Sequence, residues 1–148
     1  MLTYECYSKQ NLPAPAVKRA VTQFLFQHLD EYGDPAEAIE KAIDYALSVN
    51  DKPGGFVMIA KDEDKIVSAV VINKTGMQDY IPDNILVYIA TDVNERGKGI
   101  GKNIMQKAIE KAEGDIALHV EPENPAKRLY EHLGFTNKYL EMRLKKGS

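Results

Sequence analysis

Apolar residues recur at helical spacing in two stretches of the first third of the chain, and these stretches predict two amphipathic helices. The expected buried stripes are Val17, Val21, Phe24, Leu25 and Leu29 in the first helix and Ile39, Ile43 and Leu47 in the second. Asp34 is expected to cap the second helix, with Pro35 at the first helical position and Glu37 completing a capping box.

The next apolar runs are short and predict strands. Residues 2–8 alternate weakly and could form a first strand. Residues 56–61 and 66–73 flank a charged turn, which predicts a hairpin. Residues 85–90 are apolar at both parities, so we expect a strand that is covered on both faces.

The last third of the chain alternates helical and strand patterns. The expected elements are a helix through Ile100, Ile104, Ala108 and Ala112 that Gly114 ends, a strand over 116–120, a short helix over 126–133 that Gly134 ends, and a last strand over 139–144. Strands and helices in this order predict an α/β fold, with a mixed sheet and helices on its faces. The length of 148 residues fits one domain, over residues 1–146.

Composition narrows the class of protein. The formal net charge is −3 and no basic face is evident, so nucleic-acid binding is not expected. No apolar run approaches the ~18 residues that span a bilayer, and no secretion signal is recognisable, so we expect a cytoplasmic protein without a membrane partner. Three scattered histidines form no metal-binding cluster, and His28 and His132 are expected on helix surfaces.

The glycine-rich segment between the strand over 85–90 and the following helix carries the strongest chemical signal. Its residues are Arg96, Gly97, Lys98, Gly99, Ile100, Gly101 and Lys102. Backbone N–H groups of such a turn can converge on a phosphate, and the positive end of the helix dipole favours the same charge. Three cationic side chains in the same place make phosphate binding a better interpretation than a purely steric turn.

Two common phosphate motifs fit this segment poorly. A P-loop would need glycine where Arg96 stands and Ser or Thr where Asn103 stands. A dinucleotide fingerprint would need a third glycine at Lys102, although Glu121 lies at a suitable distance for a ribose-binding acid. Only 47 residues follow Gly101, which is too short for the other half of a doubly wound sheet, so dinucleotide binding remains a distant alternative.

Two segments resemble the Gcn5-related N-acetyltransferase (GNAT) family. Arg96, Gly99 and Gly101 match its Arg/Gln-x-x-Gly-x-Gly/Ala signature, within residues 89–101. Residues 124–135 resemble its Asn…Leu-Tyr-x-x-x-Gly-Phe segment, although Tyr130 follows Asn124 by six residues where many members have seven. The resemblance implies a central, mostly antiparallel mixed sheet that splays apart at its two parallel strands.

The resemblance also implies a donor and a way to bind it. Acetyl-CoA, or another acyl-CoA, would be held by backbone amides of residues 97–102 on its pyrophosphate, and the strand segment Ile89, Ala90 and Thr91 would bond the pantetheine arm like an extra strand. Asn124 is the further cofactor-binding candidate. The oxyanion donor is expected to be a backbone N–H near Ala90 or Thr91.

By the same resemblance, Tyr130 is the candidate acid that protonates the leaving thiolate. His119 stands where some relatives have a basic glutamate, and an imidazole is suited to accept a proton near neutral pH. A structural histidine is the competing interpretation. No metal is implied.

The sequence therefore predicts an acyl-CoA-dependent N-acyltransferase that acts by direct transfer in a ternary complex. The acceptor would be a small-molecule or peptide amine. A non-catalytic acyl-CoA-binding or regulatory module is the alternative. Exposed strand edges could pair between chains in a homodimer.

Overall fold

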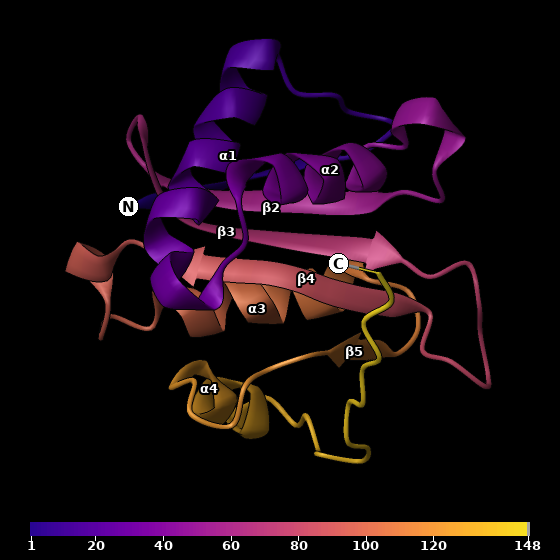
Figure 1. Cartoon of the computed structure of the whole chain (residues 1–148). Helices are drawn as coiled ribbons and strands as arrows, with labels where there is room; N and C mark the ends of the chain where they lie inside the picture. Colours follow the sequence, from indigo (N-terminus) through magenta and orange to yellow (C-terminus); the bar gives the residue numbers. More distant parts are fainter. Residues whose placement is uncertain (148) are drawn as a thin grey trace. The chain divides into compact units, whose positions relative to one another are not determined.

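The computed structural model describes residues 1–147, which form two compact units, Met1–Leu118 and the chain from His119 onward (Figure 1). The first unit contains β1 (Leu2–Tyr7), α1 (Pro15–Leu29), α2 (Ala36–Ala46), β2 (Gly55–Asp62), β3 (Lys65–Lys74), β4 (Asn84–Thr91), α3 (Ile100–Lys111) and β5 (Ile116–Leu118). Three single-turn 3-10 helices join them, at Asp30–Tyr32, Val49–Asp51 and Val93–Glu95. The second unit contains α4 (Ala126–His132). That residues 1–146 fold as one domain stays a prediction.

The five strands form one sheet in the order β1-β2-β3-β4-β5. Neighbours from β1 to β4 are antiparallel, whereas β4 and β5 are parallel. The parallel pair needs a long crossover, which α3 supplies. The α/β class and the mixed, mostly antiparallel sheet are thus confirmed.

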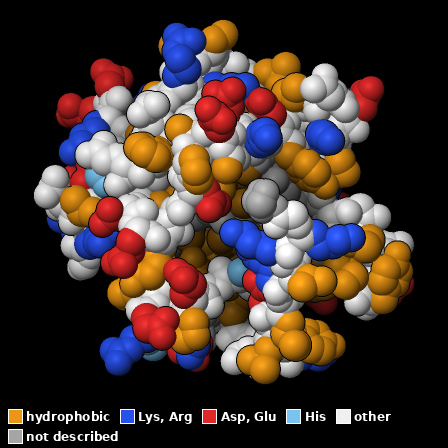
Figure 2. Space-filling model, viewed as in Figure 1, with side chains coloured by type: hydrophobic (Ala, Val, Ile, Leu, Met, Phe, Trp, Pro, Cys, Tyr) orange, Lys and Arg blue, Asp and Glu red, His pale blue; other side chains and the backbone are white. Residues whose placement is uncertain are grey.

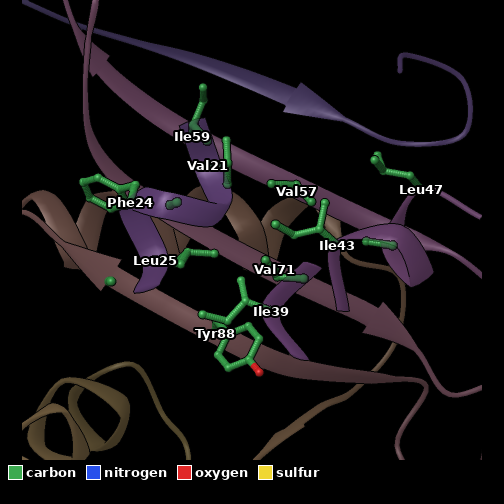
Figure 3. Close-up of a cluster of buried hydrophobic side chains, with 13 residues drawn as sticks. Val21, Phe24, Leu25, Ile39, Ile43, Leu47, Val57, Ile59, Val71 and Tyr88 are labelled. Carbon is green, nitrogen blue, oxygen red and sulfur yellow. The ribbon is translucent and has the colours of Figure 1, made fainter. Parts of the chain in front are cut away.

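Helices cover both faces of this sheet because the central strands β2 and β3 are apolar at both parities. On one face, α1 and α2 pack against odd-numbered residues of β2 and β3 and against Tyr88 of β4 (Figure 3). On the other face lies α3, whose buried residues are Ile100, Ile104, Met105 and Ala108. The two helices on one side and α3 on the other fix the position of the segment that joins β4 to α3.

A β-bulge interrupts β4. Val71 pairs with Tyr88, but its neighbour Ile72 pairs with Leu86, so Val87 is an extra residue on β4. The bulge reverses the side-chain alternation, and Leu86 and Ile89 therefore both belong to the α3 face. Coverage of β4 is also less even than predicted, because alternate residues along the strand are only half-buried.

The predicted cap of α2 is wrong. Pro35, in an extended conformation, precedes the first helical residue, and no side chain caps the helix. The Asp34 carboxylate instead accepts a hydrogen bond of 2.5 Å from the hydroxyl of Tyr88, 54 positions further along the chain. This tertiary partner replaces the local capping bond, and Glu37 completes no capping box.

Two strand predictions in the last third also differ from the structure. The strand predicted over 116–120 ends at Leu118, because pairing with β4 stops there. The strand predicted over 139–144 is absent from the described residues. A strand requires a hydrogen-bonded neighbour, and no pairing of this segment occurs within residues 1–147. Its apolar side chains are largely exposed, namely those of Tyr139, Leu140, Met142 and Leu144.

Candidate functional site

The segment between β4 and α3 is an open turn whose shape depends on two glycines. Gly97 and Gly99 have φ values of +85° and +77°, in the left-handed region that favours glycine. A Cβ atom at either position would meet no heavy atom within 4 Å. Glycine is therefore required by the backbone conformation and not by crowding, and the turn exposes its backbone to solvent.

The turn ends at the N-terminus of α3, where backbone donors are free. The first hydrogen bond of this helix runs from Asn103 N–H to the carbonyl of Gly99, at 3.0 Å. The N–H groups of Ile100, Gly101 and Lys102 consequently have no acceptor one turn earlier. No side chain caps the helix and its first turn carries no acidic residue. Free donors at the positive end of a helix make an anion-binding site.

The three cationic side chains of the turn have different surroundings. Arg96 donates from Nη2 to the carbonyl of His28, at 3.4 Å. Lys98 is ion-paired with Glu95, whose hydrogen bond and charge raise the pKa of the lysine. Lys102 is exposed and has no ion-pair partner within residues 1–147. Lys102 is thus the cation best able to meet an incoming anion.

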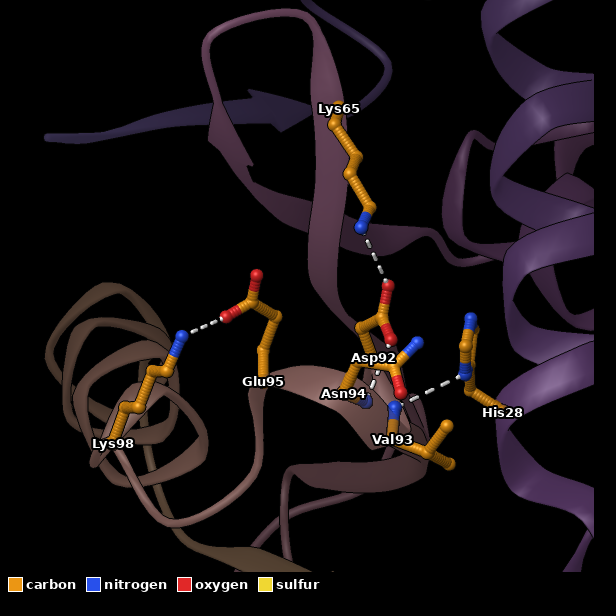
Figure 4. Close-up of polar contacts among 7 residues, drawn as sticks. All are labelled: His28, Lys65, Asp92, Val93, Asn94, Glu95 and Lys98. Carbon is orange, nitrogen blue, oxygen red and sulfur yellow. Dashed lines mark hydrogen bonds and ion pairs between the residues drawn. The ribbon is translucent and has the colours of Figure 1, made fainter.

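Asp92 anchors the start of the turn (Figure 4). This aspartate is 4% exposed, and its carboxylate accepts the N–H of Asn94 at 2.9 Å. It also forms an ion pair of 3.3 Å with Lys65. The Asn94 bond is the main cause of the lowered pKa of Asp92; burial opposes it, and the charges of Lys65 and His28 add to it. The Asp92 carboxylate is therefore ionised, and its contacts with Asn94 and Lys65 hold it in one position.

The end of β4 presents a free edge. Asp92 N–H donates to the carbonyl of Val67 at 2.9 Å. In an antiparallel pair, residues that exchange hydrogen bonds alternate with residues that do not. Ala90 therefore directs its N–H and carbonyl toward β3, whereas Ile89 and Thr91 direct theirs away from it. Because β5 pairs only with the first three residues of β4, no other strand of the first unit meets these groups.

Ser68 reinforces this edge from the neighbouring strand. Its hydroxyl is fully buried and donates to the carbonyl of Ala90 at 2.9 Å. The same oxygen lies 3.1 Å from the hydroxyl of Thr91. Both contacts fix the last residues of β4.

The parallel pair of β4 and β5 ends at Leu86 and Leu118. The splaying predicted for the two parallel strands corresponds to this end of pairing.

The second unit holds the other predicted site residues. Tyr130 of α4 is 7% exposed, and its ring lies edge-on to that of Phe135, with centroids 6.0 Å apart. Burial raises the pKa of Tyr130 to about 12. Its hydroxyl forms no hydrogen bond with another residue of the described range 1–147.

His119 and Asn124 precede α4. His119 is exposed and lies outside any strand. The side-chain oxygen of Asn124 accepts the N–H of Ala126 at 2.9 Å, just before the helix. The structure thus brings together the predicted residues from Ile89 to Lys102 in the first unit, and His119, Asn124 and Tyr130 belong to the second.

Sequence reasoning missed four residues that hold the turn or the end of β4 before it, namely His28, Lys65, Ser68 and Asp92. His28 is 7% exposed, so its predicted place on a helix surface is wrong. One signal was available: His28 follows Val21 and Leu25 at the spacing of the buried stripe of α1. Side-chain contacts of Lys65 and Ser68 come from strand pairing, which no local pattern specifies.

Two predictions from the sequence concern a metal-binding cluster and a membrane-spanning helix, neither of which was expected. Within residues 1–147 no group of three or more His, Cys, Asp or Glu side chains could hold a metal ion. Over the same range, no helix has the length and apolar character needed to cross a membrane. On the face shown in Figure 2, acidic and basic side chains are interspersed, consistent with the small net charge.

Comparison with known proteins supports one family. Residues 20–135 match the family model described as the acetyltransferase (GNAT) family. A search of curated proteins found no significant match.

Solved structures share the fold at low sequence identity. A NatC complex bound to Gag peptide and CoA is 20% identical, with a TM-score of 0.70 over 93% of this chain and 86% of that chain. An aminoglycoside N-acetyltransferase in complex with CoA is 15% identical, with a TM-score of 0.71 over 99% and 95%. A predicted acetyltransferase with acetyl-CoA from Clostridium acetobutylicum is 16% identical, with a TM-score of 0.63 over 97% and 96%.

Proposed function

Because the chain belongs to the GNAT acetyltransferase family, we propose that it transfers an acyl group, in the first instance acetyl, from acyl-CoA to a primary amine. One observation carries this proposal: an exposed turn with free backbone donors follows directly on a strand edge with free backbone groups. A long ligand with a pyrophosphate at one end and an amide-bearing arm at the other matches this succession of sites.

In this proposal the backbone holds the donor. The N–H groups between Gly97 and Lys102 bind the pyrophosphate, and the Lys102 ammonium adds charge from the exposed side. Ile89 bonds the pantetheine amides through its outward-facing N–H and carbonyl, and Thr91 does so through its carbonyl, which leaves the Thr91 N–H for the thioester. Ala90, between them, keeps its own backbone groups on β3. Asn124 is a further polar contact.

Acyl-CoA supplies an activated thioester carbonyl, and the residues of this chain orient it and move protons. The amine nitrogen forms the new bond to the carbonyl carbon while the bond from carbon to sulfur breaks. We assign to Thr91 N–H the role of oxyanion donor, because it faces the free edge. His119, exposed and able to exchange protons with solvent, takes the proton that the attacking amine loses.

Tyr130 acts on the leaving sulfur in this scheme. With its pKa near 12, the phenol stays protonated at all physiological pH values and is available as a donor. A thiol has an ordinary pKa of about 8.5, well below that of this phenol, so complete proton transfer from the phenol to the thiolate is uphill. We therefore assign Tyr130 a hydrogen bond to the developing thiolate, which later takes its proton from solvent.

The acceptor is an amine of unassigned class. The similar structures include one with a peptide and one of an aminoglycoside-modifying enzyme. Both classes, small-molecule and peptide amines, belong in a screen.

The Tyr130→Phe variant tests the proposal, with Tyr139→Phe as a matched control. The change keeps the ring and its contact with Phe135 and removes a hydroxyl that forms no hydrogen bond within residues 1–147. The free energy of unfolding should therefore stay nearly the same, and the dissociation constant of CoA should change by no more than about twofold. Turnover of the amine found by screening for thiol release should fall by about 10²- to 10³-fold, the range for the loss of one preorganised hydrogen-bond donor. Tyr139 is 79% exposed, and its variant should match the wild type.

Three outcomes are informative. CoA affinity without turnover of any amine by the wild type would favour a non-catalytic acyl-CoA-binding module. Unchanged turnover in Tyr130→Phe would refute the role of the phenol and leave the rest of the proposed function standing. Absence of CoA binding by isothermal titration would refute the proposed function.

A further inference from the structure

His28, at the last turn of α1, touches the glycine-rich turn at two points, of which Figure 4 shows the contact with Val93. Its Nδ1 accepts a hydrogen bond from the backbone N–H of Val93, at 3.4 Å. Its own carbonyl accepts the bond from Arg96 Nη2 described above. The ring also packs on Phe24, with centroids 4.5 Å apart. One buried residue of α1 therefore contacts both the first residue after Asp92 and the first residue of the glycine-rich segment.

The contact with Val93 depends on the protonation state of the imidazole. A neutral ring accepts at one nitrogen and donates at the other, whereas a protonated ring donates at both. Protonation of His28 would therefore place two N–H donors face to face, one from the ring and one from Val93. The contact that helps to start the turn would be lost.

The charged groups around His28 act in both directions. Asp92, the residue after β4, is buried and negatively charged and attracts a protonated ring; the charge of such a ring is the smallest contribution to the lowered pKa of Asp92. Arg96 in the turn repels it, and so does Lys65 of β3, which is ion-paired with the Asp92 carboxylate. A protonated His28 would compete with Asn94 N–H and Lys65 for the carboxylate. Either change alters the start of the turn.

We propose that His28 is a positioning residue that couples the affinity of the glycine-rich turn for CoA to pH: the neutral ring holds the turn in its binding form, and protonation releases it. This inference rests on the proposed function, because it concerns the same phosphate site. Histidine is the side chain whose charge ordinarily changes in the pH range of about 5 to 8. Binding should therefore weaken as the pH falls through this range.

Two substitutions separate the hydrogen bond from the packing. His28→Gln keeps an oxygen acceptor and cannot be protonated, so it should bind CoA at pH 8 nearly as the wild type does. His28→Phe keeps an aromatic ring and loses the acceptor, so its affinity should be about 2- to 12-fold weaker at pH 8, the range for one hydrogen bond. His132→Gln, which changes an exposed histidine of α4, is the control.

The measurement is the dissociation constant of CoA, by isothermal titration, from about pH 8 to pH 5.5. The phosphate groups of CoA also titrate near pH 6, so the informative quantity is the difference between variants. The wild type and His132→Gln should lose at least threefold more affinity than His28→Gln over this range. Superimposable pH profiles of wild type and His28→Gln would overturn the inference, and so would unchanged affinity of His28→Phe at pH 8.

A second measurement does not need the ligand. The amide resonance of Val93 in the free protein should titrate together with the ring nitrogens of His28, and it should not titrate in His28→Gln. If the wild type bound no CoA at any pH, the proposed function would fail, and this titration would still decide whether His28 controls the turn. A Val93 amide that ignores the protonation of His28 would overturn the inference by itself.

Discussion

Replacing Gly99 with alanine separates what the turn contributes to stability from what it contributes to binding. Gly99 has a φ of +77°, and an added Cβ would meet no atom within 4 Å. The only cost to folding is therefore backbone strain, about 1–2 kcal/mol for an alanine in the left-handed region. For a chain of 148 residues this corresponds to a decrease of about 3–6 °C in the melting temperature.

Gly76 provides a matched control in the loop between β3 and β4. Its φ is +80°, and an added Cβ would likewise meet nothing within 4 Å. Gly76→Ala should therefore lower the free energy of unfolding by the same amount as Gly99→Ala. Only Gly99→Ala alters the proposed CoA site, where the new methyl group projects from the exposed backbone that faces the pyrophosphate.

The loss of binding should be much larger than the loss of stability. A hydrogen bond to a charged group contributes about 1.5–3 kcal/mol, so one displaced contact between a backbone N–H and a phosphate corresponds to an increase of about 10- to 150-fold in the dissociation constant of CoA. Urea unfolding and isothermal titration on the same samples measure both quantities. Equal CoA affinities of the two variants would show that the turn is only a steric connection and that the anion binds elsewhere.

Two further changes concern Tyr88 and Lys102. Burial, and then the hydrogen bond and charge of Asp34, raise the pKa of Tyr88, so its neutral form contributes stability that is fully present below about pH 10 and is lost as the pH rises further. Tyr88→Phe should cost about 1 kcal/mol at pH 7, and urea unfolding should show this difference from the wild type narrowing above pH 10; a constant difference would contradict the assignment. Lys102→Gln should weaken CoA binding about fivefold at low ionic strength and less at high salt, while Lys41→Gln, an exposed change on α2, should have no effect; salt-independent weakening would indicate a role other than charge.

Much of the first unit could be predicted because its signals are local. The helical stripe from Val17 to Leu29 and the hairpin around the charged turn each depend on residues that are close in sequence. The glycine-rich segment was equally accessible, since Gly97 and Gly99 stand where a strand meets a helix. In each case the element is determined by residues that are close in sequence, so the sequence pattern was enough to predict it.

The features that could not be predicted involve partners far apart in sequence. Asp34 has the residue type of a helix cap, but Tyr88 on a distant strand takes its carboxylate. His28 is polar and yet buried, because the turn after β4 brings Val93 and Arg96 to it. The bulge at Val87 follows from the pairing of two strands, and a valine in this position gives no local signal that predicts a bulge.

The same long-range contacts explain how a turn built on glycine can act as a preorganised site. Glycine has more freedom in the unfolded chain than other residues, and two left-handed glycines with free N–H groups beyond them have little of their own to hold them in place. In this chain the support comes from contacts around the glycines: Asp92, ion-paired with Lys65 of β3, fixes the first residues of the turn, and His28 holds it from α1 through Val93 and Arg96. A fixed backbone loses less freedom on binding, and affinity therefore rises without any added contact. It follows that Asp92→Ala and His28→Phe, which remove these supporting contacts and lie away from the ligand in the proposed binding mode, should affect CoA affinity as strongly as substitutions of the cations that face it.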